Sequence, residues 1–135
     1  MPATAGDTFL LTRGTGEVPH LWVILWGPAD AAQAFLAVYL TTLRSHSDRS
    51  CILTGGEHPF VQHDTAVAYG AVQRWTDEKL GELVARGIAR ARPPVSADVL
   101  DRLRAGFFAS QRTPHAIRSM AVEEFGAVDP HPRSG

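Results

Sequence analysis

The chain has 135 residues, 44% of them hydrophobic and 20% charged, which is typical of a folded domain with a sizeable apolar core. The 13 basic and 14 acidic residues give a net charge of -1, which excludes a chain-wide basic field for nucleic acid. A single cysteine, Cys51, excludes an internal disulfide and a thiolate zinc cage. We therefore expect a cytoplasmic protein, with neither a transmembrane helix nor a signal peptide and no membrane partner.

The first 75 residues carry the pattern of β-strands. Short β-branched and aromatic runs alternate with clusters of Gly, Pro and His. Breakers are expected at Gly14 to Gly16, at Gly27 to Asp30 and at Gly55-Gly56. The predicted strands are Thr8 to Thr12, His20 to Trp26, Ala34 to Leu43, Cys51 to Leu53, Ala66 to Ala71 and Val72 to Trp75.

After Trp75 the apolar period becomes helical. Thr76 is a predicted N-cap for a helix over Asp77 to Arg86, which Gly87 ends. Ser96 is a predicted N-cap for a second helix with one apolar stripe. Thr113-Pro114 predicts a cap with proline in the first turn of a last helix, reaching about Phe125. We expect residues 1–125 to form one domain, with a strand part over about 6–75 and a helical part over about 76–125, and residues 126–135 to be a disordered tail.

Positive charge is concentrated in the second half of the chain. Residues 86–118 hold seven arginines and two aspartates, whereas residues 1–75 are net negative. Such a segment can contact phosphates or an acidic protein, and it can equally be a solvated helix face. Both interpretations stay open at this stage.

The densest polar group lies between Thr41 and Asp64. One run, Thr41 to His46, follows the most apolar predicted strand, and another, His58 to Thr65, follows the double-glycine turn. Side chains delivered from strand ends into loops are common binding or catalytic groups. We predict that the two loops converge and present Arg44, His46, His63 and Asp64 together.

Histidine and arginine can supply all the groups needed for metal-independent RNA cleavage. The 2′-hydroxyl requires a base, the departing oxygen an acid, and the phosphorane a cation. Asp64 is a candidate to set the tautomer of His63, provided that the strand bends between them. The alternative for His58 and His63 is that they cap turns or bond the main chain.

Other chemistries fit the sequence less well. His46, His58, His63 and Asp64 match no compact zinc spacing, so no metal and no cofactor is expected. A Gly-x-Ser-x-Gly elbow, a catalytic-cysteine context and a phosphate-binding glycine loop are all absent from the sequence.

The aromatic residues are compatible with base stacking, but their strand positions favour packing. They are Trp22, Trp26, Tyr39 and Tyr69. Alternation places Trp22, Ile24 and Trp26 on one side of their strand and leaves the other side apolar as well. A strand covered on both faces implies a closed barrel with helices outside it, or a second subunit.

The order of these elements resembles the PemK/MazF family of toxins, which share a small SH3-like barrel with the gyrase poison CcdB. The resemblance covers about residues 6–110, and no single motif in it is specific. It rests on Gly6-Asp7-Thr8-Phe9-Leu10-Leu11, His20-Leu21-Trp22-Val23-Ile24-Leu25, Val38-Tyr39-Leu40-Thr41-Thr42, Thr65-Ala66-Val67-Ala68-Tyr69 and Thr76-Asp77-Glu78-Lys79-Leu80.

The resemblance implies a homodimer that cleaves single-stranded RNA without metal and is neutralised by an acidic antitoxin. Thr41 and Thr42 match the hydroxyl pair near the family's RNA site. The chain departs from the family where Tyr69 and Ala71 replace an Arg and an acid, and where the basic loop after the first strand is reduced to Arg13 to Pro19.

We therefore expect an α+β fold, a small SH3-like antiparallel β-barrel of five to seven strands followed by two or three C-terminal helices. The first functional hypothesis is a toxin-like endoribonuclease with His63 and His46 as acid and base and Arg44 as the cation. Substrate-positioning candidates are Thr41, Thr42, Asp64, Thr65 and Tyr69. The alternative is a non-catalytic barrel that binds protein, or a gyrase-type poison acting through its C-terminal helix.

Overall fold

A computed structural model describes residues 3–12 and 18–130. Residues 1–2, 13–17 and 131–135 lie outside the described residues, and with them the expected breaker Gly14 to Gly16 and most of the expected loop Arg13 to Pro19. The chain order is β1 (Thr8–Leu11), β2 (His20–Ala29), β3 (Ala34–Thr42), β4 (Ile52–Leu53), β5 (Thr65–Val67), the 3-10 turn η1 (Tyr69–Ala71), β6 (Gln73–Thr76), α1 (Asp77–Ala85), β7 (Ala89–Arg92), α2 (Ala97–Ala109) and α3 (His115–Glu123).

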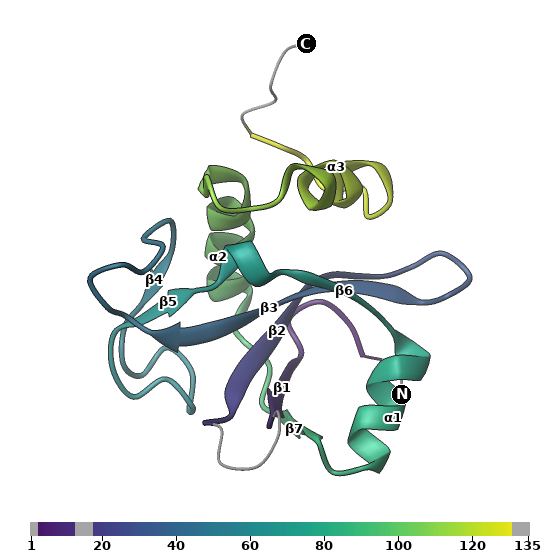
Figure 1. Cartoon of the computed structure of the whole chain (residues 1–135), viewed down its shortest axis with the longest axis horizontal. Coiled ribbons are helices and arrows are strands. Elements are labelled where there is room, and N and C mark those ends of the chain that lie inside the picture. The colour runs from purple at the N-terminus through teal and green to yellow at the C-terminus, as the bar shows by residue number, and fades with distance from the viewer. Residues whose placement is uncertain (1–2, 13–17, 131–135) are drawn as a thin grey trace.

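The strands form one antiparallel sheet, and the α+β fold class is confirmed (Figure 1). The strand order is β4-β5-β3-β2-β1-β7, and β6 pairs with β3 as well. On the side away from β2, the first half of β3 pairs with β6 and its last three residues pair with β5. The edge strands β4 and β7 do not pair with each other within the described residues, so the expected barrel is wrong in one respect: the sheet is not closed.

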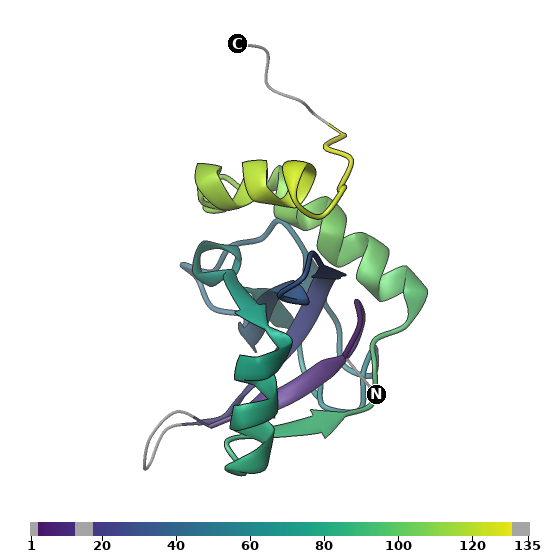
Figure 2. The same cartoon turned by 90° about the vertical axis from the view of Figure 1, so that its right-hand side faces the viewer.

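Both faces of β2 are buried, as the sequence predicts, and this chain covers both of them. Leu21, Val23 and Leu25 pack on one side with residues of α2 and α3, while Trp22 and Ile24 pack on the other with Leu80 of α1. The two views show α2 and α3 at one side of the sheet and α1 at the other (Figures 1 and 2). A second subunit is therefore not required to cover this strand.

Trp26 lies on the opposite face from the one that alternation predicts. The pairing of β2 with β3 shifts register between Ile24 and Trp26, and again between Trp26 and Ala29. An extra residue in one strand reverses the faces of the residues that follow it. Trp26 consequently joins Leu25 in the core under α2. There its ring meets the ring of Phe107 edge-on, with 4.9 Å between the ring centroids.

Local capping signals account for the first two helices. The Thr76 hydroxyl accepts a hydrogen bond from the amide of Lys79, and the Ser96 hydroxyl accepts one from Val99, as predicted. The predicted cap at Thr113 is wrong, because its buried hydroxyl donates instead to the carbonyl of Phe107 in the last turn of α2. Pro114 takes the N-cap position of α3 without a side-chain bond.

Three segments differ from the predicted elements. Gly27 to Ala29 continues β2 rather than breaking it, and the run predicted as one strand over Ala66 to Ala71 divides into β5 and η1. Strand β7 lies inside the part expected to be helical. The described start of the expected tail packs on α3, because the Ala127 amide donates to the carbonyl of Ala121 at 2.9 Å.

None of the α-helices in the described ranges combines the length and the apolar character that a bilayer crossing requires.

Candidate functional site

The end of β3 separates two pockets that share three residues. Thr41, Thr42 and Arg44 line both of them, and all three were predicted site residues. We name the pockets after one further residue in each. The Arg112 pocket has a volume of about 380 Å³, and the Phe60 pocket has a volume of about 490 Å³. The two pockets therefore lie next to each other at the strand end.

The Arg112 pocket is built from segments far apart in sequence. Its walls are the end of β3, the loop that follows it, the β5–η1 segment and the α2–α3 connection. The residues that line it are Tyr39, Thr41, Thr42, Arg44, His46, Ser47, Asp48, Ala66 to Ala71 and Arg112. The loop is shaped locally, since the Arg44 amide donates to the Ser47 hydroxyl at 2.8 Å.

Asp48 fixes the floor of this loop. Its carboxylate accepts hydrogen bonds from the amide and hydroxyl of Ser50 and from the hydroxyl of Ser110. Burial alone would raise the pKa of this carboxyl, but the bonds from Ser110 and Ser50 and the charge of Arg112 hold the pKa below its usual range. Asp48 is thus ionised at neutral pH, and its oxygens are already occupied.

Two cations face the Arg112 pocket. The Arg112 guanidinium donates one hydrogen bond to the main-chain oxygen of His46 at 2.8 Å. Neither Arg112 nor Arg44 forms an ion pair with a carboxylate in the part of the chain that the structure describes. The pocket therefore has two guanidinium groups with donors available to an anion.

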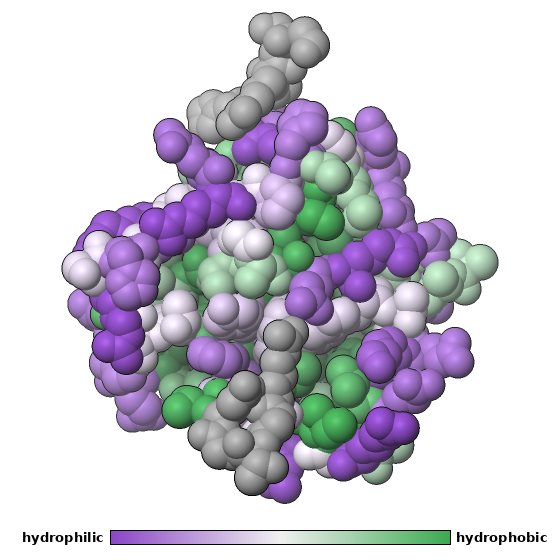
Figure 3. Space-filling model, viewed as in Figure 1, coloured by the Kyte–Doolittle hydropathy of each residue, from purple (hydrophilic) through white to green (hydrophobic). Residues whose placement is uncertain are grey.

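The Phe60 pocket is built from the residues around the start of β2, the end of β3 and the loop that carries Phe60. It is lined by Val18, Pro19, His20, Leu40, Thr41, Thr42, Arg44, Pro59 to His63 and Thr65. Phe60 is 40% exposed, which is unusual for a large aromatic side chain. Hydrophilic residues dominate the surface over the loops beside β4 and β5, with smaller apolar areas between them (Figure 3).

The loop that carries Phe60 is closed by its own main chain. The Gly56 amide donates to the carbonyl of Val61, and the Val61 amide donates to the carbonyl of His58, both at 2.9 Å. The two sides of the loop approach closely at Gly55, where an added Cβ would lie 2.9 Å from the oxygen of Gln62. Only glycine fits this approach, so the double-glycine turn is a structural requirement.

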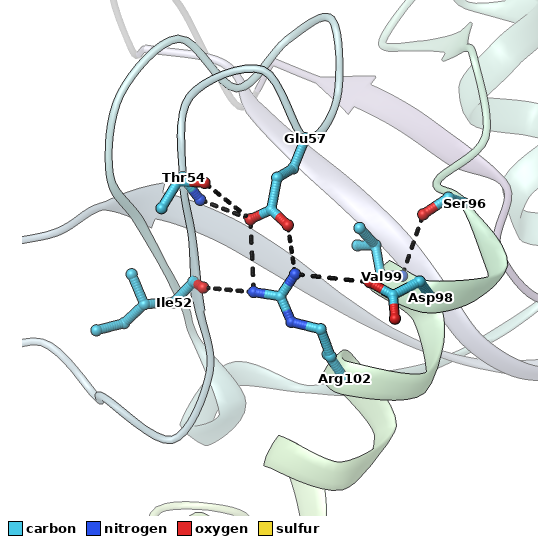
Figure 4. Close-up of polar contacts among 7 residues, drawn as sticks. All are labelled: Ile52, Thr54, Glu57, Ser96, Asp98, Val99 and Arg102. Carbon is cyan, nitrogen blue, oxygen red and sulfur yellow. Dashed lines mark hydrogen bonds and ion pairs between the residues drawn. The ribbon is translucent and has the colours of Figure 1, made fainter.

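An ion pair holds the same loop against α2 (Figure 4). The Arg102 guanidinium binds the Glu57 carboxylate and also donates to the carbonyl of Ile52 at 2.9 Å. Glu57 in turn accepts from the amide of Thr54 at 2.7 Å. The hydrogen bond from Arg102 lowers the pKa of Glu57, so the pair stays charged well below neutral pH.

His58 is a structural residue. Its ring is 3% exposed, its Nδ1 accepts the amide of Phe60 at 3.0 Å, and its Nε2 contacts the carbonyl of Pro93. The ring is therefore a neutral tautomer with the proton on Nε2. The main-chain alternative stated above for His58 is confirmed. Within the described ranges no cluster of three or more His, Cys, Asp or Glu residues has a metal-binding arrangement.

His46 and His63 line different pockets. His46 lies in the Arg112 pocket and His63 in the Phe60 pocket. Of the four residues expected to lie together, Arg44, His46, His63 and Asp64, only Arg44 lines both pockets. The Nδ1 of His63 contacts the main-chain oxygen of Asp64 at 3.2 Å, whereas the carboxylate was the predicted partner. A carbonyl oxygen can only accept a hydrogen bond, so Nδ1 is the donor in this contact. In the neutral ring the lone pair is then on Nε2.

Three predicted substrate-positioning residues have other surroundings. Asp64 is exposed and lines neither pocket, and the buried Thr65 hydroxyl donates to the carbonyl of His63 at 2.8 Å. Tyr69 borders the Arg112 pocket but is 0% exposed, and its hydroxyl donates to the carbonyl of Leu103 at 2.7 Å. Burial strongly raises the pKa of Tyr69, so its phenol remains neutral and serves the core.

Several arginines of the basic segment are used internally. Arg102 pairs with Glu57, and the buried Arg118 pairs with Asp129 at 2.9 Å. Arg104 donates to the carbonyl of Leu25 and lies over the ring of Trp26. The excess of arginine in this segment is therefore partly structural.

Sequence patterns alone did not identify Arg112 or Phe60 as pocket residues. Arg112 is 66 residues from His46, whose carbonyl it binds, so no local spacing relates them. A signal for Phe60 was present, since an aromatic residue after Gly-Gly-Glu-His-Pro is placed in a turn rather than in a core strand. No protein-family model, no curated protein and no solved structure matches this chain.

Proposed function

We propose that this chain is an endoribonuclease that cleaves single-stranded RNA by metal-independent transesterification. The observation that carries the proposal is the pair of adjacent pockets at the end of β3, which share Arg44, with His46 in one pocket and His20 and His63 in the other. Adjacent pockets that together offer a cation, hydroxyl groups and an exposed aromatic ring suit a single strand. The RNA substrate implies a cytoplasmic site of action.

The groups in the two pockets suit two proton transfers and one charge stabilisation. In the proposed reaction, His63 Nε2 removes the 2′-hydroxyl proton, and the resulting oxygen attacks the adjacent phosphorus. Arg44 stabilises the phosphorane, and His46 donates a proton to the departing 5′ oxygen. The products are a 2′,3′-cyclic phosphate and a new 5′-hydroxyl end. Thr41 and Thr42 bond the strand where the two pockets meet.

The test is cleavage of a mixed single-stranded RNA ladder in EDTA. We expect the wild type to cut and to leave cyclic phosphate ends. His63→Ala and His46→Ala should each slow cleavage by about 10²- to 10⁴-fold, the usual contribution of one acid or base. Arg49→Ala is the matched control, because this exposed arginine lies in the same loop as His46 and lines neither pocket. Undiminished cleavage by either histidine variant removes that residue from the mechanism.

A non-catalytic protein-binding module is the second candidate. It is favoured by the Phe60 pocket, where the apolar residues Phe60 and Val18 are both exposed, and by the separation of the two histidines. A gyrase-type poison acting through α3 belongs to the same class. Absence of cleavage by the folded wild type, together with capture of a defined protein that Phe60→Ala no longer binds, would support this candidate over the nuclease.

The proposal includes a homodimer and an acidic antitoxin, as the PemK/MazF resemblance implies. The apolar faces of β2 no longer argue for the dimer, because the chain covers them itself. Light scattering on the purified protein tests the dimer. Inhibition of cleavage by the product of a neighbouring reading frame tests the antitoxin.

A further inference from the structure

We propose that the Arg112 pocket binds one internal phosphate of the RNA strand, with Arg112 and Arg44 as its two guanidinium ligands. The inference rests on the proposed function. It adds to that function one phosphate-binding residue, Arg112, which is remote in sequence from the other site residues. It also predicts how the RNA crosses the site: the phosphate occupies the Arg112 pocket on one side of β3, and a neighbouring base occupies the Phe60 pocket on the other side.

The charge balance of the Arg112 pocket favours an anion. Two arginines line it, and the one carboxylate among the lining residues, Asp48, already accepts three hydrogen bonds from Ser50 and Ser110. The negative charge of Asp48 also reduces the positive potential that the two arginines create in the pocket. The pocket therefore suits a phosphodiester with one negative charge rather than a dense polyanion.

The position of Arg112 is fixed before a ligand binds. Its main-chain amide donates to the Ser110 hydroxyl at 3.0 Å, and Ser110 in turn donates to Asp48. One guanidinium nitrogen is held by the carbonyl of His46 at 2.8 Å. A guanidinium has five donors in a rigid plane, so the remaining donors can form paired bonds to phosphate oxygens at little further entropic cost.

The first assay measures binding of a fluorescent 2′-O-methyl single strand, which the proposed reaction cannot cut, over a range of salt concentrations. We expect Arg112→Ala to weaken binding roughly tenfold, as the loss of a charge-assisted contact implies. The slope of log affinity against log salt should fall by about 0.7, the value for one phosphate contact on a single strand. Arg112→Lys should keep the slope and bind more weakly than the wild type, because lysine lacks the planar fork.

Arg49→Ala is the control for the loss of one surface charge, and we expect little change in affinity and slope. A merely structural role for Arg112 would lower the affinity without changing the slope. An Arg112→Ala slope equal to that of the wild type overturns the inference, and so does failure of the wild type to bind the strand. Displacement of the strand by inorganic phosphate at the same ionic strength would identify a small free anion as the ligand and would also overturn it.

The outcomes separate this inference from the proposed function. Arg112-dependent binding of the 2′-O-methyl strand without cleavage of RNA would keep the phosphate site and remove the nuclease chemistry. Cleavage that depends on His46 and His63 but is unchanged in Arg112→Ala would keep the chemistry and remove the phosphate site.

Discussion

The two pockets beside β3 share Thr41, Thr42 and Arg44 but are assembled in different ways. The Arg112 pocket needs β3, η1 and the α2–α3 connection to pack together. The Phe60 pocket also uses the start of β2, but one of its walls is a short loop that closes on itself and is held by Arg102. One wall of the Phe60 pocket is therefore formed locally, whereas the Arg112 pocket depends on tertiary packing, so a substitution can damage one pocket and spare the other.

The largest expected effect on stability comes from Gly106→Ala, which acts on the packing behind the Arg112 pocket. An added Cβ would overlap the hydroxyl of Tyr69 and lie 2.8 Å from the Cβ of Cys51. We expect a loss of about 1–3 kcal/mol in the free energy of unfolding, as for other overpacked cores. Because Tyr69 begins η1, the Arg112-dependent part of strand binding should also weaken.

Gly81→Ala is the matched control for that substitution. Gly81 lies inside α1 with nothing within 4 Å of an added Cβ, so alanine should stabilise the helix by up to about 1 kcal/mol. Denaturant unfolding of both variants measures the difference. Equal stabilities for the two variants would contradict the tight packing of α2 on Tyr69.

The segments that build the two pockets should also lose stability in acid, each through one carboxylate. The hydrogen bond from Arg102 lowers the pKa of Glu57, and bonds from Ser110 and Ser50 outweigh burial to lower the pKa of Asp48. A carboxyl whose pKa is lower in the folded state adds stability above its unfolded pKa. That stability is lost as the pH falls through the lower, folded value.

Glu57→Gln and Asp48→Asn each remove one of these titrations. At pH 7 each should cost about 1 kcal/mol, because a charged hydrogen-bond acceptor becomes a neutral one. Between about pH 5 and pH 3 each variant should lose less stability than the wild type does. Denaturant unfolding at a series of pH values is the measurement, and parallel curves for wild type and variant would show that the carboxylate is not the titrating group.

The smallest expected change in stability is that of Phe60→Ala. The side chain is 40% exposed, so its loss should change the free energy of unfolding by less than about 0.5 kcal/mol. The neighbouring Val61 is 3% exposed and packs in the core, so Val61→Ala should cost about 1–2 kcal/mol. Thermal unfolding of the pair tests whether the loop presents Phe60 outward, and a large loss for Phe60→Ala would contradict that.

The parts of the fold that depend on neighbours in sequence were predictable. Thr76 and Ser96 cap their helices as expected, because a cap is a contact between residues three apart. Strand β7 was missed because its sequence, Ala-Arg-Ala-Arg, contains no β-branched or aromatic residue, and because its pairing with β1 joins distant parts of the chain. Trp26 was assigned to the wrong face because a register shift leaves no mark in the period.

The sequence predicted the residues that the two pockets share, but not how the other site residues are divided between the pockets. Thr41 and Thr42 end the strongly apolar strand β3 and Arg44 follows it, so the sequence pattern could place them where a strand passes into a loop. The strand position of Tyr69 favours packing, but its hydrogen bond to the carbonyl of Leu103 in α2 is a long-range contact that no local pattern predicts. Nothing in the sequence assigns His46 and His63 to different pockets.

The late position of β7 in the chain has a consequence for synthesis on the ribosome. Strand β1 pairs with β2 on one side and with β7 on the other, so its outer edge has no partner until residue 92 has left the exit tunnel. During that interval the nascent chain presents an open apolar strand edge, which is a template for association with other chains. Slower translation before β7 should therefore lower the yield of folded protein, and coexpressed chaperones should restore it.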